Sequence, residues 1–183
     1  MESTEERNRA KVGKLAGIVG IICNFALAGG KFVVGTLVSS MSIIADSVNN
    51  LSDAASSIVT LLGFKLAEKP ADKKHPFGHA RFEYLASLTV AVMIFVIGFE
   101  LAKSSVEKII SPTPVKFSLV TILVLVVSIL VKLWMTLFYK KKGKQIHSTT
   151  LLATSADSRN DVLTTTCVLI AMVVELLTKW QID

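Results

Sequence analysis

The stretch Ala45-Asp46-Ser47-Val48-Asn49-Asn50-Leu51-Ser52-Asp53 is polar, although it lies inside a segment long and apolar enough to cross a lipid bilayer. A second polar run, Ser155-Ala156-Asp157-Ser158-Arg159-Asn160-Asp161, begins another apolar segment and carries two carboxylates four residues apart. A charged side chain in the hydrocarbon costs about 2.5 to 3.5 kcal/mol or more, so acids retained there are functional by default. These two runs decide both the fold and the candidate site.

The composition places the chain in a membrane. Of its 183 residues 51% are hydrophobic, the mean hydropathy is +0.58, and the apolar residues come in blocks. A hydrocarbon core of about 30 Å needs roughly 20 apolar residues per helix, so the blocks predict an all-α bundle of transmembrane helices. Five spans are expected, over residues 14–38, 42–66, 82–103, 117–139 and 151–177. They form one transmembrane domain, 14–178, between a tail at 1–13 and a tail at 179–183.

Basic residues flank the spans and predict their orientation. They cluster before the first span, around the connection between the second and third spans, and at residues 140–144, which are expected to form a loop. All three places lie on one side if the spans alternate, so the amino terminus is expected in the cytoplasm and the carboxyl terminus outside. The plasma (inner) membrane is the expected location. Because these positions account for the net charge of +6, no nucleic-acid partner is expected.

The acids of each polar run share one helix face. At 100° per residue, Asp46, Asn50 and Asp53 point within about 60° of one another, and Asp157 and Asp161 are likewise four residues apart. The second span runs inward and the fifth outward, and the rise per residue brings the two runs to similar depths in the bilayer. We therefore expect the two carboxylate faces to meet.

Few basic residues in the spans are placed to neutralise these acids. Lys31 and Lys132 lie close enough to the predicted span ends that we expect them to snorkel to the interface, and Arg159 points away from the acidic face of its helix. Unpaired acids favour a bound cation, exchangeable protons, or both. Carboxylate and amide oxygens suit Mn²⁺, Mg²⁺ or Fe²⁺ better than Zn²⁺ or Cu⁺. The alternative is a structural role, with the acids hydrogen-bonded to Ser and Thr of adjacent helices.

The ordered motifs resemble a known family. Residues 40–53, the run His75-Pro-Phe-Gly-His79-Ala-Arg-Phe-Glu83 and the run Ala156-Asp157-Ser-Arg-Asn-Asp161 look like a cation diffusion facilitator, a divalent-metal/proton antiporter. The resemblance covers nearly the whole chain. It implies a transport site at positions matching Asp46, Asn50, Asp157 and Asp161, and this Asn/Asp/Asp/Asp combination is similar to the family's manganese exporters.

Four further positions carry open alternatives. Asp53 shares the acidic face but lies outside the family's four-ligand pattern, so it is either an accessory ligand or a cap for polar groups of a neighbouring helix. Asp72, His75 and His79 match a second, cytoplasmic metal site of the family. Pro76 and Gly78 interrupt any regular helix there, so hydrogen bonding of the histidines to the loop backbone is the alternative.

The resemblance implies a function and a partner. Three close carboxylates repel one another and retain protons, so Mn²⁺ entering from the cytoplasm would displace protons, while Asn50 would coordinate without titrating. We expect a homodimer, no tightly bound cofactor and no enzymatic activity. A membrane metalloenzyme is a weaker alternative, since no hydrolase or protease motif accompanies the acids. The family's sixth span and cytoplasmic domain have no counterpart after the fifth span, so a nontransporting fragment or interaction subunit is the other alternative.

Overall fold

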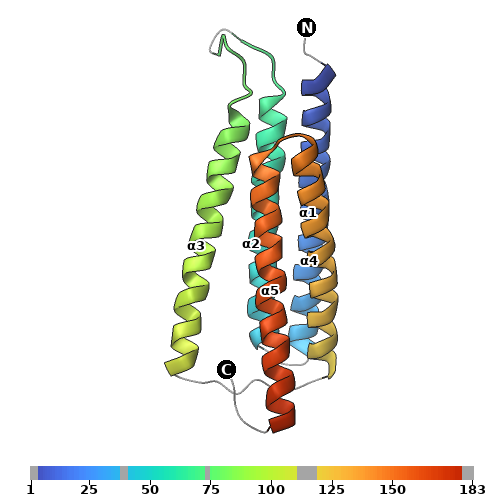
Figure 1. The fold of residues 1–183 in the computed structure, drawn as a ribbon, viewed down its shortest axis with the longest axis vertical. Coiled ribbons are helices and arrows are strands. Elements are labelled where there is room, and N and C mark those ends of the chain that lie inside the picture. Colours follow the sequence, from blue (N-terminus) through green and yellow to red (C-terminus); the bar gives the residue numbers. More distant parts are fainter. Residues whose placement is uncertain (1–3, 38–40, 73–74, 111–118, 179–183) are drawn as a thin grey trace.

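The computed structural model describes residues 4–37, 41–72, 75–110 and 119–178, and these residues form a bundle of long helices (Figure 1). The helices are α1 (Thr4–Leu37), α2 (Met41–Ala67), α3 (Phe82–Ile110), α4 (Leu119–Gln145) and α5 (Thr149–Thr178). The described part of the chain contains no strand. The expected all-α architecture and the number of long helices are therefore confirmed.

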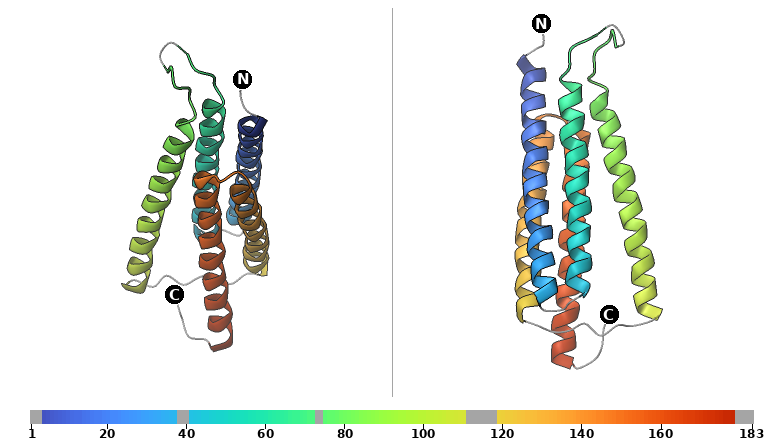
Figure 2. Two further views of the ribbon diagram at one scale, coloured as in Figure 1. Left: turned by 45° about the horizontal axis from the view of Figure 1, so that its top comes forward. Right: turned by 180° about the vertical axis from the view of Figure 1, so that it is seen from behind.

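Successive helices alternate in direction, so the connections gather at two ends. One end, here called the amino-terminal end, holds the start of α1, the loop between α2 and α3 and the turn between α4 and α5; the opposite end is here called the far end (Figures 1 and 2). Consequently α2 and α4 run from the far end towards the amino-terminal end, while α5 runs the other way. This alternation matches the topology that the basic residues predict.

Close helix pairs form the core. The helix α1 lies against α2, and α4 lies against α5 (Figure 2). Contact between α1 and α2 is close enough to require glycine, because a Cβ on Gly17 would lie 2.8 Å from the Cβ of Leu61. One cluster of fully buried apolar side chains draws on four helices: Ala16, Phe64, Met135, Tyr139 and Leu151. It holds α1, α2, α4 and α5 together.

The helix α3 is attached mainly near the amino-terminal end. There Gly63 of α2 gives room for Ala86 of α3, and the Ser87 hydroxyl of α3 is hydrogen-bonded to Thr150 of α5. Towards Ile110 the helix diverges from the rest of the bundle (Figure 1). Its exposed face is apolar and includes Phe95 and Phe99, as expected for a helix surrounded by lipid.

Three described helices contain segments long and apolar enough to cross a membrane: Asn8–Leu37, Phe82–Glu100 and Leu119–Gln145. Their mean hydropathies are 1.8, 2.0 and 2.4. The helices α2 and α5 have comparable lengths, 27 and 30 residues, but they carry the two polar runs. The polar side chains of the candidate site therefore lie on the two helices with the weakest membrane signal.

Three helices extend six or more residues beyond their predicted spans, and one of them is α3, which ends at Ile110 and not at residue 103. The basic residues 140–144, predicted as a loop, belong to α4, which continues to Gln145 because this stretch contains no proline. The connection to α5 is a turn of three residues in which exposed His147 has a φ of +49°. The helix α1 also begins ten residues earlier than predicted, at Thr4. The predicted turn at 39–41, the prolines at 112 and 114 and the tail at 179–183 lie wholly or partly outside the described residues.

Candidate metal centre

Three carboxylates converge inside the bundle, from α2 and α5. One oxygen each from Asp53, Asp157 and Asp161 lies within 4.8 Å of the other two. Asp53 is 3% exposed, and the two α5 acids are half-buried. We call these three residues the bundle cluster. The prediction that the acidic faces of the second and fifth helices meet is borne out by this contact, with Asp53 as the α2 acid that takes part.

A lysine from α4 completes the bundle cluster. Its Nζ lies 2.6 Å from Asp53 Oδ2 and 2.6 Å from Asp161 Oδ2. Lys132 is only 4% exposed and stands at the midpoint of the 27-residue helix α4. The expectation that Lys132 snorkels was wrong, because its ammonium is enclosed between Asp53 of α2 and Asp161 of α5. From mid-helix the ammonium is about 20 Å from either helix end.

The other α2 acid is held elsewhere. Asp46 Oδ2 lies 2.8 Å from Nζ of Lys31, which comes from α1 and is 4% exposed. Seven residues separate Asp46 from Asp53, so the two carboxylates start about 10 Å apart along the axis of α2. The expectation that Lys31 snorkels was also wrong, because the side chain is enclosed where α1 packs against α2.

Asn50 lies between these two acids along α2 and is 1% exposed. Its Nδ2 donates a hydrogen bond to the backbone carbonyl of Asp46 at 2.8 Å. Its Oδ1 is buried and has no hydrogen-bond partner among the residues that the structure describes. A buried amide oxygen left without a donor costs free energy, so it is a natural position for a ligand or water.

Hydroxyl groups surround the acids but do not pair with them. Ser56 and Ser57 both donate to the carbonyl of Asp53, and Thr136 donates to the carbonyl of Lys132. In the described part of the chain, no Ser or Thr hydroxyl donates to the carboxylates of the two polar runs. These contacts argue against the alternative in which the acids serve as acceptors for neighbouring hydroxyls.

The charges of the two runs do not cancel. If all groups are ionised, the four carboxylates carry four negative charges and the two buried lysines carry two positive charges, which leaves two negative charges. Arg159 is exposed, as predicted, and Asp157 has no ion-pair partner among the described residues. One divalent cation or two protons would thus neutralise the net charge of these buried groups.

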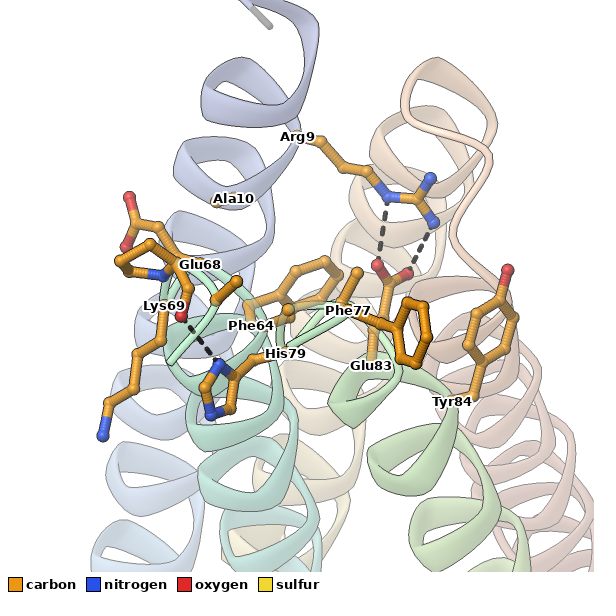
Figure 3. A pocket seen from close by; sticks show the side chains of 14 residues that line it. Arg9, Ala10, Phe64, Glu68, Lys69, Phe77, His79, Glu83 and Tyr84 are labelled. Atoms are coloured by element: carbon orange, nitrogen blue, oxygen red, sulfur yellow. Dashed lines mark hydrogen bonds and ion pairs between the residues drawn. The ribbon is translucent and has the colours of Figure 1, made fainter. Parts of the chain in front are cut away.

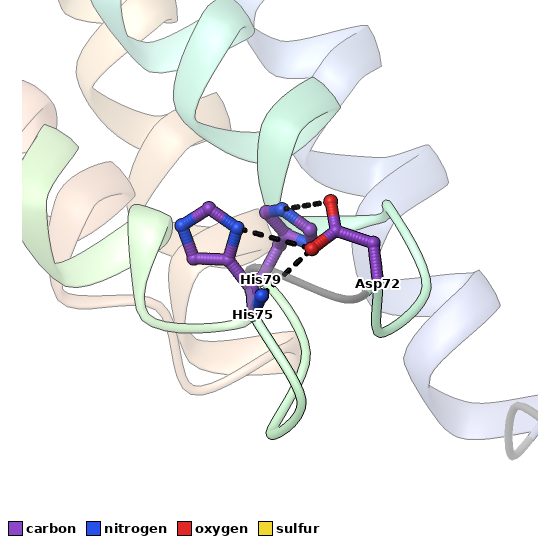
Figure 4. A group of neighbouring side chains, drawn as sticks. All are labelled: Asp72, His75 and His79. Atoms are coloured by element: carbon purple, nitrogen blue, oxygen red, sulfur yellow. Dashed lines mark hydrogen bonds and ion pairs between the residues drawn. The ribbon is translucent and has the colours of Figure 1, made fainter.

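A second group of metal-binding side chains lies in the loop between α2 and α3 (Figure 4). Asp72, His75 and His79 each offer a ligand atom within 4.8 Å of the others, and we call these residues the loop cluster. Asp72 Oδ1 accepts a hydrogen bond from the His75 backbone N–H at 2.7 Å, and Gly78 adopts a φ of +80°. The tight turn brings together side chains that their spacing alone does not align.

The ring of His79 is oriented for coordination. Its Nδ1 lies 3.0 Å from the carbonyl oxygen of Pro70, so Nδ1 carries the proton and donates it. The other nitrogen, Nε2, faces Asp72 Oδ2 at 3.7 Å. This backbone contact is what the structural alternative predicted for a histidine, yet it is also the usual way in which proteins orient a metal-binding imidazole.

A pocket of about 290 Å³ adjoins the loop cluster at the amino-terminal end (Figure 3). His79 is one of its lining residues. Arg9 of α1, another lining residue, makes two hydrogen bonds of 3.0 Å to Glu83 of α3 (Figure 3). Lys14 of α1 pairs with Glu68, just after α2. These ion pairs tie α1 to both ends of the loop, so the position of the loop cluster depends on them.

The sequence indicated the acids and the loop residues that the structure brings together, but it missed the contacts of both lysines. A signal for Lys132 was present: it is the only charged residue between Phe117 and Tyr139, with fifteen uncharged residues before it and seven after it. A lysine inside such an apolar segment is stabilised by a buried acid. The sequence left Asp53 as either an accessory ligand or a cap for a neighbouring helix; in the structure Lys132 pairs with both Asp53 and the α5 acid Asp161.

Comparisons with known proteins agree with these observations. The model of the cation efflux transmembrane domain matches residues 17–183. An uncharacterized transporter of Methanocaldococcus jannaschii, MJ0449, is 35% identical over 158 residues, which cover 86% of this chain and 56% of that protein. The manganese efflux system protein MneS of Bacillus subtilis is 29% identical over 157 residues, covering 86% and 54%. The magnetosome protein MamB of Magnetospira sp. strain QH-2 is 31% identical over 143 residues, covering 78% and 49%.

The chain spans about half the length of the curated relatives that it matches. The domain match nevertheless covers most of the chain, and the apolar helices and buried acids fit a protein that moves ions through a bilayer. It is an integral membrane protein and belongs to the cation efflux family, of which it carries the transmembrane domain.

Proposed function

We propose that the chain forms the ion pathway of a divalent metal exporter that carries Mn²⁺ out of the cytoplasm in exchange for protons. The observation that carries this proposal is the bundle cluster, in which Asp53, Asp157 and Asp161 converge beside Asn50, whose Oδ1 is buried without a partner. Acids inside a membrane mark ion pathways, and here two helices contribute to one group.

Ligand chemistry supports manganese over zinc. The candidate ligands in the bundle are carboxylate and amide oxygens, which suit Mn²⁺ and Fe²⁺, and no described histidine or cysteine joins the bundle cluster. The relatives MneS and MneP of Bacillus subtilis are named manganese efflux system proteins, at 29% and 22% identity. Fe²⁺ and Zn²⁺ remain the alternative cargoes to be tested against Mn²⁺.

The two α2 acids, Asp46 and Asp53, bind the cation in different states of the transporter in this proposal. Asp157, Asp161 and Asn50 bind the cation together with Asp53 in the arrangement seen. Asp46, about 10 Å closer to the far end of α2, serves as the α2 ligand when the site opens towards that end. The separate pairing of Asp46 with Lys31 and of Asp53 with Lys132 supports such a division.

Protons are the proposed counter-ions. The two uncompensated negative charges of the interior bind either one Mn²⁺ or two protons, so the arrival of one releases the other. The acids therefore act both as ligands and as proton carriers, while Asn50 coordinates without titrating.

The loop cluster is proposed as a second metal site at the cytoplasmic mouth. The carboxylate of Asp72 and the imidazole of His75 are exposed enough to exchange metal, whereas His79 is 7% exposed. Basic residues of α1, of the loop and of the end of α4 lie at this same end of the bundle (Figure 1). By the rule for cytoplasmic basic residues, we place the amino terminus in the cytoplasm, in a plasma membrane, and include a homodimer in the proposal.

Flux through proteoliposomes tests this proposal. The reconstituted chain should move Mn²⁺ down an imposed gradient, measured with a manganese-quenched dye, and a pH-sensitive dye should record protons moving the opposite way. Flux without proton movement would exclude the exchange. Absence of flux for Mn²⁺, Fe²⁺ and Zn²⁺ in vesicles that retain folded protein would exclude transport by this chain.

A further inference from the structure

Lys132 places a positive charge at the point where the helices α2 and α5 bring their acids together. Its Nζ is 2.6 Å from an oxygen of Asp53 and 2.6 Å from an oxygen of Asp161. We propose that Lys132 is a tethered counter-cation that occupies the cargo position when no cargo is bound and excludes monovalent cations from it. The inference rests on the proposed function, because it concerns the same carboxylates.

The geometry makes occupation by the lysine and by a metal mutually exclusive. A cation that binds Oδ2 of both Asp53 and Asp161 must lie between these two oxygens, and the ammonium already lies there, within hydrogen-bonding distance of both. Lys132 is 4% exposed, so it is not a surface lysine that reaches in from the interface. A metal that binds these two oxygens must therefore move the ammonium aside.

Electrostatics decides which cations can do so. Without a cation the buried acids repel one another and have lost their hydration, so the lysine stabilises the empty site. Na⁺ or K⁺ would replace one positive charge with another and would also have to shed water, whereas the ammonium is tethered and already dehydrated. A divalent ion brings twice the charge to the same oxygens. A divalent cation can therefore displace the Lys132 ammonium from these carboxylates, whereas a monovalent cation cannot.

The displaced ammonium has an acceptor within its reach. Ser128 lies four residues before Lys132 on α4, is 1% exposed, and its Oγ has no hydrogen-bond partner among the described residues. Helical side chains lean towards the amino terminus of their helix, which directs the lysine stem towards that turn. Moving there would take the ammonium off Asp161 without exposing it to lipid.

Mn²⁺ affinity in two salts tests the inference. The affinity is measured by electron paramagnetic resonance on the purified chain in detergent, in choline chloride or in NaCl of equal ionic strength. All proteins carry His75→Ala and His79→Ala, which removes the loop cluster. Lys132→Gln should bind Mn²⁺ about tenfold or more tightly in choline, since two charge-assisted hydrogen bonds no longer compete, and Na⁺ should weaken that binding.

The controls separate the local effect from general electrostatics. Lys140→Gln removes an exposed positive charge from the same helix and should behave like the parent in both salts. Lys132→Arg keeps the charge and should remain insensitive to Na⁺. If Lys132→Gln does not fold, the same comparison is made between Asp53→Asn and Asp53→Asn/Lys132→Gln, where removing the lysine should again tighten Mn²⁺ binding.

The outcomes distinguish the two claims. The counter-cation role of Lys132 is overturned if the parent binds Mn²⁺ and Lys132→Gln binds it equally or more weakly, with no sensitivity to Na⁺. That result would not contradict the proposed export of Mn²⁺. Failure of the parent and of every Lys132 variant to bind Mn²⁺, Fe²⁺ or Zn²⁺ overturns the proposed function and the inference together.

Discussion

The bundle cluster and the loop cluster both bring three ligand-bearing side chains within 4.8 Å, but they do so in opposite environments. The bundle cluster uses oxygen ligands only, is enclosed by helices and contains a lysine. The loop cluster combines imidazole with carboxylate, and its residues Asp72 and His75 are exposed. In the proposed function, the same number of ligands serves a transport site in the bundle and an exchangeable metal site in the loop.

The difference follows from the cost of burial. In the loop, water can solvate the exposed carboxylate of Asp72, so its charge costs little free energy. In the bundle, uncompensated acids are expensive, so the fold supplies its own cations from α1 and α4. A metal binding in the loop replaces water, whereas a metal binding in the bundle must replace a protein charge.

The largest expected effect is that of removing an α5 acid. Asp161→Asn should lower Mn²⁺ flux in proteoliposomes at least about 100-fold, because even changes outside the ligand shell of a metal cost 10- to 100-fold. Arg159→Gln is the matched control, since it alters an exposed charge two residues away on the same helix. Flux by Asp161→Asn at the level of the control would show that the cation does not pass through the bundle cluster.

The two α2 acids should respond differently. Asp53→Asn should weaken equilibrium Mn²⁺ binding by about tenfold, the effect of one lost charged ligand contact. Asp46→Asn should change that affinity less but lower flux, because Asp46 is paired with Lys31 in the arrangement seen. Calorimetric titration and flux measured on the same preparations provide the comparison. A larger loss of affinity in Asp46→Asn would reverse the proposed division between the acids.

Asn50→His should add an imidazole ligand, as found in the loop cluster, to the oxygen ligands of the bundle. An imidazole N–H can replace the amide donor to the Asp46 carbonyl, and its second nitrogen replaces Oδ1 with a softer ligand. We expect the ratio of Zn²⁺ to Mn²⁺ flux to rise on the order of tenfold. Asn50→Gln keeps the amide and is the control. An unchanged ratio in the histidine variant would mean that residue 50 does not set selectivity.

Removing the loop cluster should affect binding more than transport. His75→Ala/His79→Ala should lose one Zn²⁺ per chain in a calorimetric titration, because Asp72 alone is a weak ligand for Zn²⁺. Mn²⁺ flux should stay within about twofold, since the bundle cluster is intact. Loss of flux comparable to that of Asp161→Asn would make the loop cluster an obligatory part of the pathway.

The smallest effect is expected at the pair that holds the loop in place. Arg9→Gln removes two hydrogen bonds to Glu83, a residue that is 7% exposed, so we expect about 1 kcal/mol of destabilisation. Zn²⁺ binding at the loop cluster should weaken slightly, while Mn²⁺ binding in the bundle should not change. Thermal unfolding and the two titrations check this, with exposed Lys11→Gln as the control.

Much of the architecture could be predicted because bilayer thickness constrains helix length. Five apolar blocks gave five helices, and the spacing of Asp157 and Asp161 placed both on one face of α5. The end of α4 could not be found in this way, since a helix that leaves the membrane continues for as long as its local sequence permits. Hydropathy marks the bilayer, not the last hydrogen-bonded turn.

The pairing of the acids depended on contacts that no local pattern encodes. Whether Asp46 or Asp53 meets α5 is decided by how α2 is placed against α4 and α5, a shift of two helical turns that leaves the acidic face unchanged. The lysines were misjudged for a related reason: both are enclosed by neighbouring helices, where Lys31 pairs with Asp46 and Lys132 pairs with Asp53 and Asp161. Tertiary packing, not residue type, fixed these roles.

The most direct test of the central claim, that the bundle cluster holds the transported cation, is a Mn²⁺ titration of the purified chain followed by electron paramagnetic resonance. The parent chain and His75→Ala/His79→Ala should both show a Mn²⁺ site, and Asp157→Asn/Asp161→Asn should lack it. Retention of that site in the α5 double variant, together with its loss from the histidine double variant, would contradict the claim and place the metal in the loop.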